Sequence, residues 1–146
     1  MASVGDVKEK VQRIITSKFG SVRLDNQGRM VMNYKSSVVF VEVAPFGKES
    51  IRITFVAPMV TNLKITNELC RWLATDGQSK FFGNCRLNTS DGEDNGWVYF
   101  EHSILGDDVD ESEVLNALVM MHLGSDQLDN EIQSRFGGEL FGNDED

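Results

Sequence analysis

The loop from Asp91 to Gly96 contains the residue types of a calcium-binding loop. An EF-hand loop needs oxygen ligands at its first, third and fifth positions and glycine at its sixth. Asp91, Glu93 and Asn95 meet the first requirement, and Gly96 meets the second. The twelfth position should supply a bidentate glutamate but is His102, and the flanking residues predict strands where the motif needs helices. A solvated hairpin turn is therefore the favoured interpretation.

A second acidic cluster contains enough carboxylates to suggest paired acid–base groups or a cation site. It lies where the sequence predicts the start of a helix, with Asp110 as the N-cap and Glu113 completing a capping box. Acidic side chains are favoured there by the exposed backbone N–H groups and by the positive end of the helix dipole. This structural role is sufficient to explain the cluster. Its members are Asp107, Asp108, Asp110, Glu111 and Glu113.

Two histidines and two cysteines complete the set of residues that could do chemistry. His102 and His122 fall in different predicted elements, whereas a metal needs several ligands converging at about 2 Å. Cys70 and Cys85 form no C-x-x-C pair, and nothing beside them marks an activated thiol. Nucleophile-elbow, Walker and dinucleotide-binding motifs are absent. We therefore expect no catalytic residue, no metal and no cofactor, and two reduced thiols in a cytoplasmic protein.

The composition excludes several classes of partner. The chain has 146 residues, 40% of them hydrophobic and 25% charged, which is typical of one globular core. A net charge of -9 would repel phosphate backbones and anionic lipid headgroups, and the basic residues are scattered among acids. The N-terminus has no signal-peptide pattern, and no stretch approaches about 18 apolar residues. Nucleic acid and membrane are therefore not expected partners.

The elements that must position any site follow from the spacing of apolar residues. They are a helix over residues 4–19, hairpin strands over 22–24 and 30–34, strands over 38–43 and 51–58 around a turn-rich segment at 44–49, a helix after Thr66, strands over 81–87 and 97–104, and a helix from Asp110 to Gly137. Hairpins rather than repeating βαβ units indicate an α+β fold, with a mostly antiparallel sheet faced by helices. We expect one domain over residues 1–140 and an acidic, disordered tail over residues 141–146.

The first half of the last helix has more apolar residues than one buried face requires. Leu115, Val119, Met120 and Leu123 lie off the stripe that faces the core. Either this helix is buried between two layers, or its second face meets a partner. Neighbouring aromatic residues in the strands, such as Phe81 and Phe82, must point to opposite faces of the sheet. One face would then be covered by helices and the other available to a second chain.

The order of elements and several core and turn stretches resemble the YbjN-like family, which is grouped with the type III secretion chaperones. The matching stretches are residues 24–28, 39–43, 82–87, 101–106 and 126–138. The resemblance implies an α-β-β-β-α-β-β-α fold, a homodimer, and binding of extended client segments on apolar patches, without an active site. In those chaperones the second helix and the following strand commonly form the contact between the two subunits, which implies Trp72 and Phe82 as interface residues here. Spacing alone also fits Trp72 as a core residue.

Our leading hypothesis is a non-enzymatic cytoplasmic homodimer that binds a protein or peptide client. The candidate interface residues are Trp72, Phe82, Leu115, Val119 and Leu123. The main alternative is a regulatory or structural interaction protein that keeps one fixed, folded partner. An enzyme with a cysteine nucleophile is the third possibility, and it predicts a closed polar pocket around His102 or Cys85.

Overall fold

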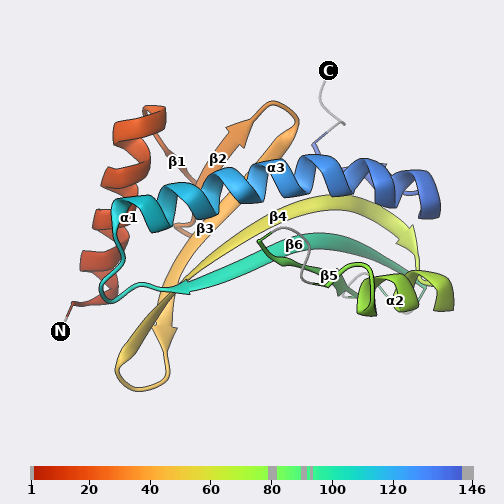
Figure 1. The fold of residues 1–146 in the computed structure, drawn as a ribbon, viewed down its shortest axis with the longest axis horizontal. Helices are drawn as coiled ribbons and strands as arrows, with labels where there is room; N and C mark the ends of the chain where they lie inside the picture. Colours follow the sequence, from red (N-terminus) through yellow and green to blue (C-terminus); the bar gives the residue numbers. More distant parts are fainter. Residues whose placement is uncertain (1, 79–81, 90–91, 93, 143–146) are drawn as a thin grey trace.

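The computed structural model describes residues 2–78, 82–89, 92 and 94–142. Within them the chain forms three helices and a seven-stranded antiparallel sheet (Figure 1). The elements are α1 (Val4–Phe19), β1 (Arg23–Leu24), β2 (Met30–Tyr34), β3 (Ser37–Phe46), β4 (Ser50–Lys64), α2 (Asn67–Ala74), β5 (Asn84–Asn88), β6 (Asn95–Leu105), α3 (Glu111–Phe136) and β7 (Glu139–Leu140). The α+β class and the order implied by the resemblance are confirmed, with two-residue strands β1 and β7 in addition.

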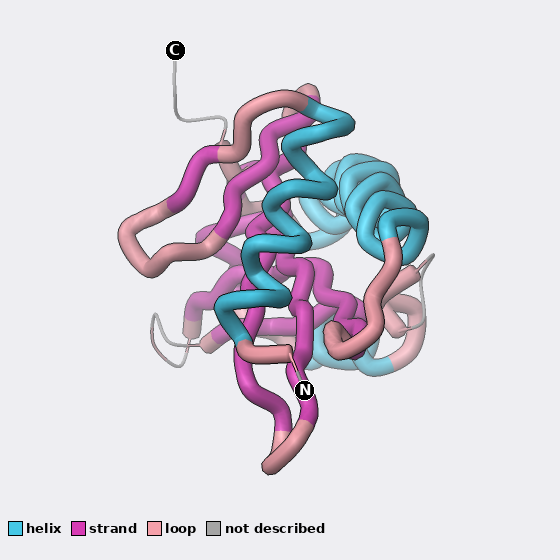
Figure 2. The backbone as a smooth tube through the Cα atoms, turned by 90° about the vertical axis from the view of Figure 1, so that its left-hand side faces the viewer, coloured by secondary structure: helices cyan, strands magenta, loops and turns pink. Residues whose placement is uncertain are grey.

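The sheet is ordered β1-β2-β3-β4-β6-β5, and β7 pairs with β4. Helices α1 and α3 both contact β3, and α3 also packs on β4 and β6. Figure 2 shows α3 nearly along its axis, beside α1. The short helix α2 lies next to β5 and touches the end of α3, where the rings of Trp72 and Phe136 are 5.9 Å apart.

The helix ends form as the capping residues predict. Ser3 and Asp6 exchange hydrogen bonds of 3.1 Å at the start of α1, and Gly20, which has φ +89°, caps the helix after Phe19. At the start of α3, the Glu113 N–H donates to Asp110 over 2.8 Å, and the Asp110 N–H donates to Glu113 over 3.0 Å. The bond from the Glu113 N–H holds the pKa of Asp110 below its usual value. Asp110, Glu111 and Glu113 therefore have the structural role that the sequence suggested, whereas Asp107 accepts a hydrogen bond from the Ile51 N–H over 3.2 Å.

Two strands are longer than the sequence indicated. Pro58 does not end β4, which continues to Lys64, because the pairing register between β4 and β6 shifts between Pro58 and Val60. Proline has no N–H to give to a ladder and is tolerated at such an irregularity. Similarly, β3 continues to Phe46, so the turn predicted at residues 44–49 is only three residues long.

Strand β7 was not predicted, because the sequence after Gly137 carries no strand pattern. Glu139 and Leu140 pair with Thr61 and Val60 of β4, and the Phe141 N–H donates to the Met59 carbonyl over 2.9 Å. The ordered pairing therefore reaches beyond residue 140. Residues 143–146 of the predicted acidic tail lie outside the described residues.

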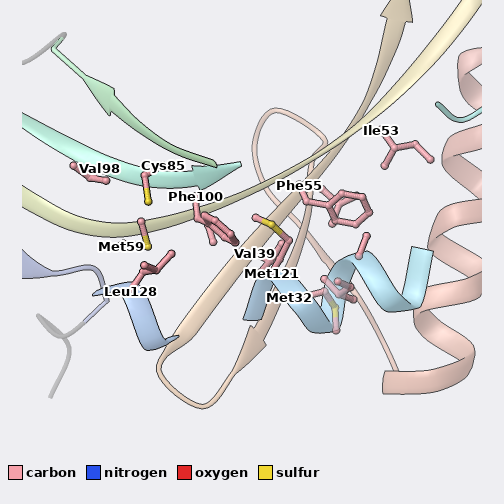
Figure 3. Packing of buried hydrophobic residues seen from close by; sticks show 14 of the residues in the cluster. Met32, Val39, Ile53, Phe55, Met59, Cys85, Val98, Phe100, Met121 and Leu128 are labelled. Carbon is pink, nitrogen blue, oxygen red and sulfur yellow. The ribbon is translucent and has the colours of Figure 1, made fainter. Parts of the chain in front are cut away.

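The core lies between the inner face of the sheet and the helices. Figure 3 shows Met59 of β4 and Leu128 of α3 facing each other, with Phe100 of β6 beside them. Met59 and Phe100 are at most 1% exposed, and Leu128 is 2% exposed. The outer face carries half-buried aromatic residues instead, among them Trp97 and Tyr99, whose ring centroids are 4.9 Å apart. Both faces of the sheet are thus apolar in part, as predicted.

Candidate functional site

A groove of about 370 Å³ lies between the end of α1, the end of β2 and the middle of α3. Phe19 is the last residue of α1 and Tyr34 the last of β2, so both side chains stand where their elements end. Val119 and Leu123 are four residues apart and therefore share one side of α3. The groove is lined by Phe19, Met32, Asn33, Tyr34, Leu118, Val119, His122 and Leu123.

The groove concentrates apolar side chains that water reaches. Eight large hydrophobic residues are exposed in the described part of the chain, and four of them line this groove. Phe19 and Val119 are 42% and 43% exposed, and Tyr34 and Leu123 are 51% and 53% exposed. Burying such area gains about 25 cal/mol per Å², so a patch that stays exposed in the single chain is typical of an interaction site.

The floor of the groove is held by a buried polar network. The Ser37 hydroxyl donates to the Tyr34 carbonyl over 2.9 Å, and its oxygen lies 2.6 Å from Nδ1 of His122. Because the single hydroxyl proton goes to the Tyr34 carbonyl, we assign the shared proton of the second bond to His122 Nδ1. The Tyr34 and His122 rings pack at 5.6 Å. Burial lowers the pKa of His122 to about 4, so the imidazole is neutral at pH 7.

The structure places the predicted interface residues in three different environments. Val119 and Leu123 line the groove, and Leu115 is half-buried one turn before Val119. Phe82 is 42% exposed and packs on His102, with ring centroids 4.5 Å apart. Trp72 is 5% exposed and belongs to the core cluster, as its spacing allowed.

Sequence reasoning did not assign Phe19, Met32, Tyr34 or His122 to a site. Phe19 was counted with the apolar stripe of the first helix, and Tyr34 with the alternation of a strand. Their convergence depends on the long-range packing of α1, β2 and α3, which leaves no local pattern. The surplus of apolar residues on the last helix was the one signal that pointed to this groove.

Within the described residues, the other candidate sites bring no set of reactive side chains together. Asp91 and Glu93 of the calcium-like loop lie outside the described residues, and Asn95 and Gly96 begin β6. Among the residues described, no group of three or more His, Cys, Asp or Glu side chains is placed to hold a metal. Cys85 lines an open pocket of about 510 Å³ between α2 and β5, whereas the enzymatic alternative requires a closed one. No helix in the described ranges is long and apolar enough to cross a membrane.

Comparison with solved structures supports the fold. A crystal structure of an uncharacterized protein from Methanothermobacter thermautotrophicus matches with a TM-score of 0.59 and 16% sequence identity. The match covers 90% of this chain and 99% of the other chain. At this identity the likeness concerns the fold alone. A search of curated proteins finds no match.

The family comparison is more specific. Residues 5–144 match the model of the TY-Chap1 family, described as type III secretion system (YopN, CesT) and YbjN peptide-binding chaperone 1. This match spans nearly the whole chain, including α1, β2 and α3, which form the groove. The resemblance to YbjN-like proteins and secretion chaperones is thereby confirmed, and the chain belongs to the TY-Chap1 family of peptide-binding chaperones.

Proposed function

We propose that the protein is a non-enzymatic cytoplasmic homodimer that binds an extended segment of a client protein in the groove between α1, β2 and α3. The observation that carries this proposal is the convergence of Phe19, Tyr34, Val119 and Leu123, all more than two-fifths exposed, on one groove. The family description as peptide-binding chaperones supports the class of partner. The reduced cysteines, Cys70 and Cys85, suit a cytoplasmic location.

Backbone pairing at the sheet edge can add to the apolar contacts. Strand β1 pairs only with Met30 and Val31 of β2, so the segment of β2 from Met32 to Tyr34 extends past its edge partner. An extended client can add a strand to such an edge, with main-chain hydrogen bonds giving affinity and side-chain pockets giving selectivity. Because Met32, Asn33 and Tyr34 also line the groove, one client segment could use both features.

The groove proposal is tested by selecting binders from a phage-displayed library of random dodecapeptides. We expect wild-type protein to enrich apolar peptides, and Leu123→Glu to lose at least tenfold in affinity for them, because a carboxylate in the groove has no partner there. Phe46→Glu is the matched control, since Phe46 is 50% exposed but lies at the end of β3, outside the groove. Equal binding by the wild type and Leu123→Glu would contradict the proposal.

The alternative function is that of an interaction module with one fixed, folded partner. The outer face of the sheet favours it, because Trp97 and Tyr99 pack against each other there and the Arg29 guanidinium lies 4.6 Å from the centre of the Phe40 ring. A folded partner would bind this face without needing the groove. Replacement of Tyr99 by Glu would then abolish the complex with a partner purified from the native host, whereas Leu123→Glu would leave it intact.

For the homodimer we propose the region of Phe82. This residue is 42% exposed, and Leu105, which is 61% exposed, lines the same shallow pocket. The region follows α2 in the chain, and the related secretion chaperones commonly form their dimer contact in the corresponding region. Trp72 is not included in this contact, because its ring is buried against Phe136 at the other end of α3.

A further inference from the structure

We propose that the groove selects a client segment that carries a tryptophan, whose indole N–H donates a hydrogen bond to Nε2 of His122. This inference rests on the proposed peptide-binding function and assigns the chemistry of the residue that occupies the groove. It follows from the acceptor that His122 presents and from the size and lining of the groove.

His122 presents an unused acceptor to the groove. Its Nδ1 atom is bonded to Ser37, and no described residue bonds its Nε2 atom. The fully buried side-chain atoms that lack a partner in the described ranges are Trp72 Nε1 and Asp129 Oδ1, so Nε2 of His122 is not fully buried. The residue as a whole is only 7% exposed and lines the groove, and its small exposed part therefore opens there.

The protonation of the ring makes Nε2 an acceptor. With the proton shared with Ser37 assigned to Nδ1, a neutral imidazole leaves Nε2 unprotonated. The low pKa of His122 keeps the ring neutral at pH 7. The bond to Ser37 and the contact with the Tyr34 ring fix the ring in place, so the acceptor is oriented before a client arrives.

The rest of the lining selects an apolar, aromatic and uncharged group. No charged side chain lines the groove, so an ammonium group would lose its hydration without gaining a counter-charge. Hydroxyl groups would bring acceptors of their own that also need partners, whereas an indole is a donor only. Phe19 and Tyr34 offer rings against which an indole can pack edge to face. A groove of about 370 Å³ has room for a large side chain with its flanking backbone.

The test uses a synthetic host peptide with apolar flanks and one variable position, occupied by tryptophan, 1-methyltryptophan or phenylalanine. Methylation removes only the N–H donor and adds one methyl group. We expect the methylated and phenylalanine peptides to bind wild-type protein about tenfold more weakly by fluorescence anisotropy, as a lost hydrogen bond of about 1.4 kcal/mol requires. Equal affinities of the tryptophan and 1-methyltryptophan peptides would overturn the inference.

Two variants separate the acceptor from the structural role of His122. The amide of His122→Asn can occupy the position of Nδ1 and keep the bond to Ser37, but it removes the acceptor at Nε2. The amide of His122→Gln reaches the position of Nε2 and loses the bond to Ser37. We expect the preference for tryptophan over 1-methyltryptophan to vanish in His122→Asn and to survive in part in His122→Gln. If the 1-methyltryptophan peptide bound His122→Asn as much more weakly than the tryptophan peptide as it binds the wild type, the weaker binding would be due to the bulk of the methyl group. That result would overturn the proposal.

Failure of the inference and failure of the proposed function have different signatures. If all three peptides bind equally and Leu123→Glu abolishes binding, the groove binds peptides without using His122. If no host peptide binds and the library selection also yields no peptide sensitive to Leu123→Glu, peptide binding in the groove is itself wrong, and the tryptophan assignment is overturned with it.

Discussion

Two ionisable side chains on α3 are buried with opposite consequences for the pH dependence of stability. Asp129 and His122 are 8% and 7% exposed. Burial raises the pKa of Asp129 to about 6, and the nearby Asp126 carboxylate adds to this rise. Burial lowers the pKa of His122 to about 4. Between about pH 4 and 6, folded Asp129 is therefore neutral where the unfolded chain ionises it, and between about pH 4 and 6.5, folded His122 is neutral where the unfolded chain protonates it.

The signs follow from the protons bound in each state. Between pH 4 and 6 folded Asp129 keeps a proton that the unfolded chain releases, so its contribution to the free energy of unfolding falls as the pH rises. Between pH 4 and 6.5 the unfolded chain protonates His122 while the folded protein does not, so its contribution rises with pH. The two contributions oppose each other. As far as these two groups determine it, the free energy of unfolding of the wild type should therefore change little with pH in this window.

Replacement of Asp129 by Asn should remove one of these opposing contributions. Oδ1 of Asp129 is buried without a partner, so the ionised carboxylate destabilises the fold at neutral pH. We expect Asp129→Asn to raise the free energy of unfolding by about 2 kcal/mol at pH 8 and by much less at pH 4, measured by urea denaturation.

Glu131→Gln is the control for Asp129→Asn, because it makes the same change of charge on an exposed part of α3. Its bond to Arg135 is a 3.8 Å surface pair, whose loss should change the unfolding free energy by less than about 1 kcal/mol at either pH. If Asp129→Asn raised the free energy of unfolding equally at pH 4 and pH 8, ionisation of the Asp129 carboxylate would not be what destabilises the fold.

At the scale of elements, the sequence was most informative where a signal is local. The capping residues Ser3 and Asp110 and the terminal glycines locate both long helices, because their hydrogen bonds join residues three or four apart. The full length of β4 was not predictable, since the register shift that accommodates Pro58 depends on β6, about 40 residues later in the chain. Strand β7 likewise exists only because α3 returns the chain to β4.

The candidate site shows the same limit. The surplus of apolar residues on α3 singled out Val119 and Leu123, because helical spacing shows which residues lie off the side that faces the core. The partners of those residues could not be predicted. The bond between Ser37 and His122 joins residues 85 apart in the chain, and neither residue type indicates the other. The polar floor of the groove thus becomes visible only when the hairpin of β2 and β3 is packed against α3.

The close approach of α3 to the sheet gives a test of this packing. A Cβ atom added at Gly124 would lie 2.7 Å from the Phe100 ring, and Phe100 is fully buried. The substitution Gly124→Ala would gain up to about 1 kcal/mol of helix propensity, but the cost of overpacking is about 1–3 kcal/mol. We expect a net loss of about 1 kcal/mol in the free energy of unfolding, measured by urea denaturation.

Gly5→Ala in α1 is the matched control. The nearest heavy atom to its added Cβ is Ser3 Oγ at 3.7 Å, an ordinary contact, so only the gain in helix propensity remains. This variant should be stabilised by about 0.5 kcal/mol. If Gly124→Ala were stabilised as much as Gly5→Ala, α3 would have to sit farther from β6 than the structure shows.

At the scale of the whole molecule, the groove and the proposed dimer contact share no lining residue. The groove lies between α1, β2 and α3, whereas Phe82 and Leu105 lie with the start of α3 and the end of β6. A dimer through the second surface would therefore present two grooves at once. Two linked sites raise the apparent affinity for a client with two apolar segments, without any new contact.

The assembly is tested by Phe82→Glu, because two like charges brought into an apolar contact lose hydration and repel each other. We expect wild-type protein to sediment as a dimer and Phe82→Glu to dissociate with a Kd raised at least tenfold, measured by analytical ultracentrifugation over a concentration series.

Phe46→Glu introduces the same charge at a residue of similar exposure and should remain dimeric. Because Phe82 does not line the groove, Phe82→Glu should bind a single-site peptide with unchanged affinity per chain. A wild-type protein that stays monomeric, or a Phe82→Glu variant that stays dimeric, would refute this dimer contact.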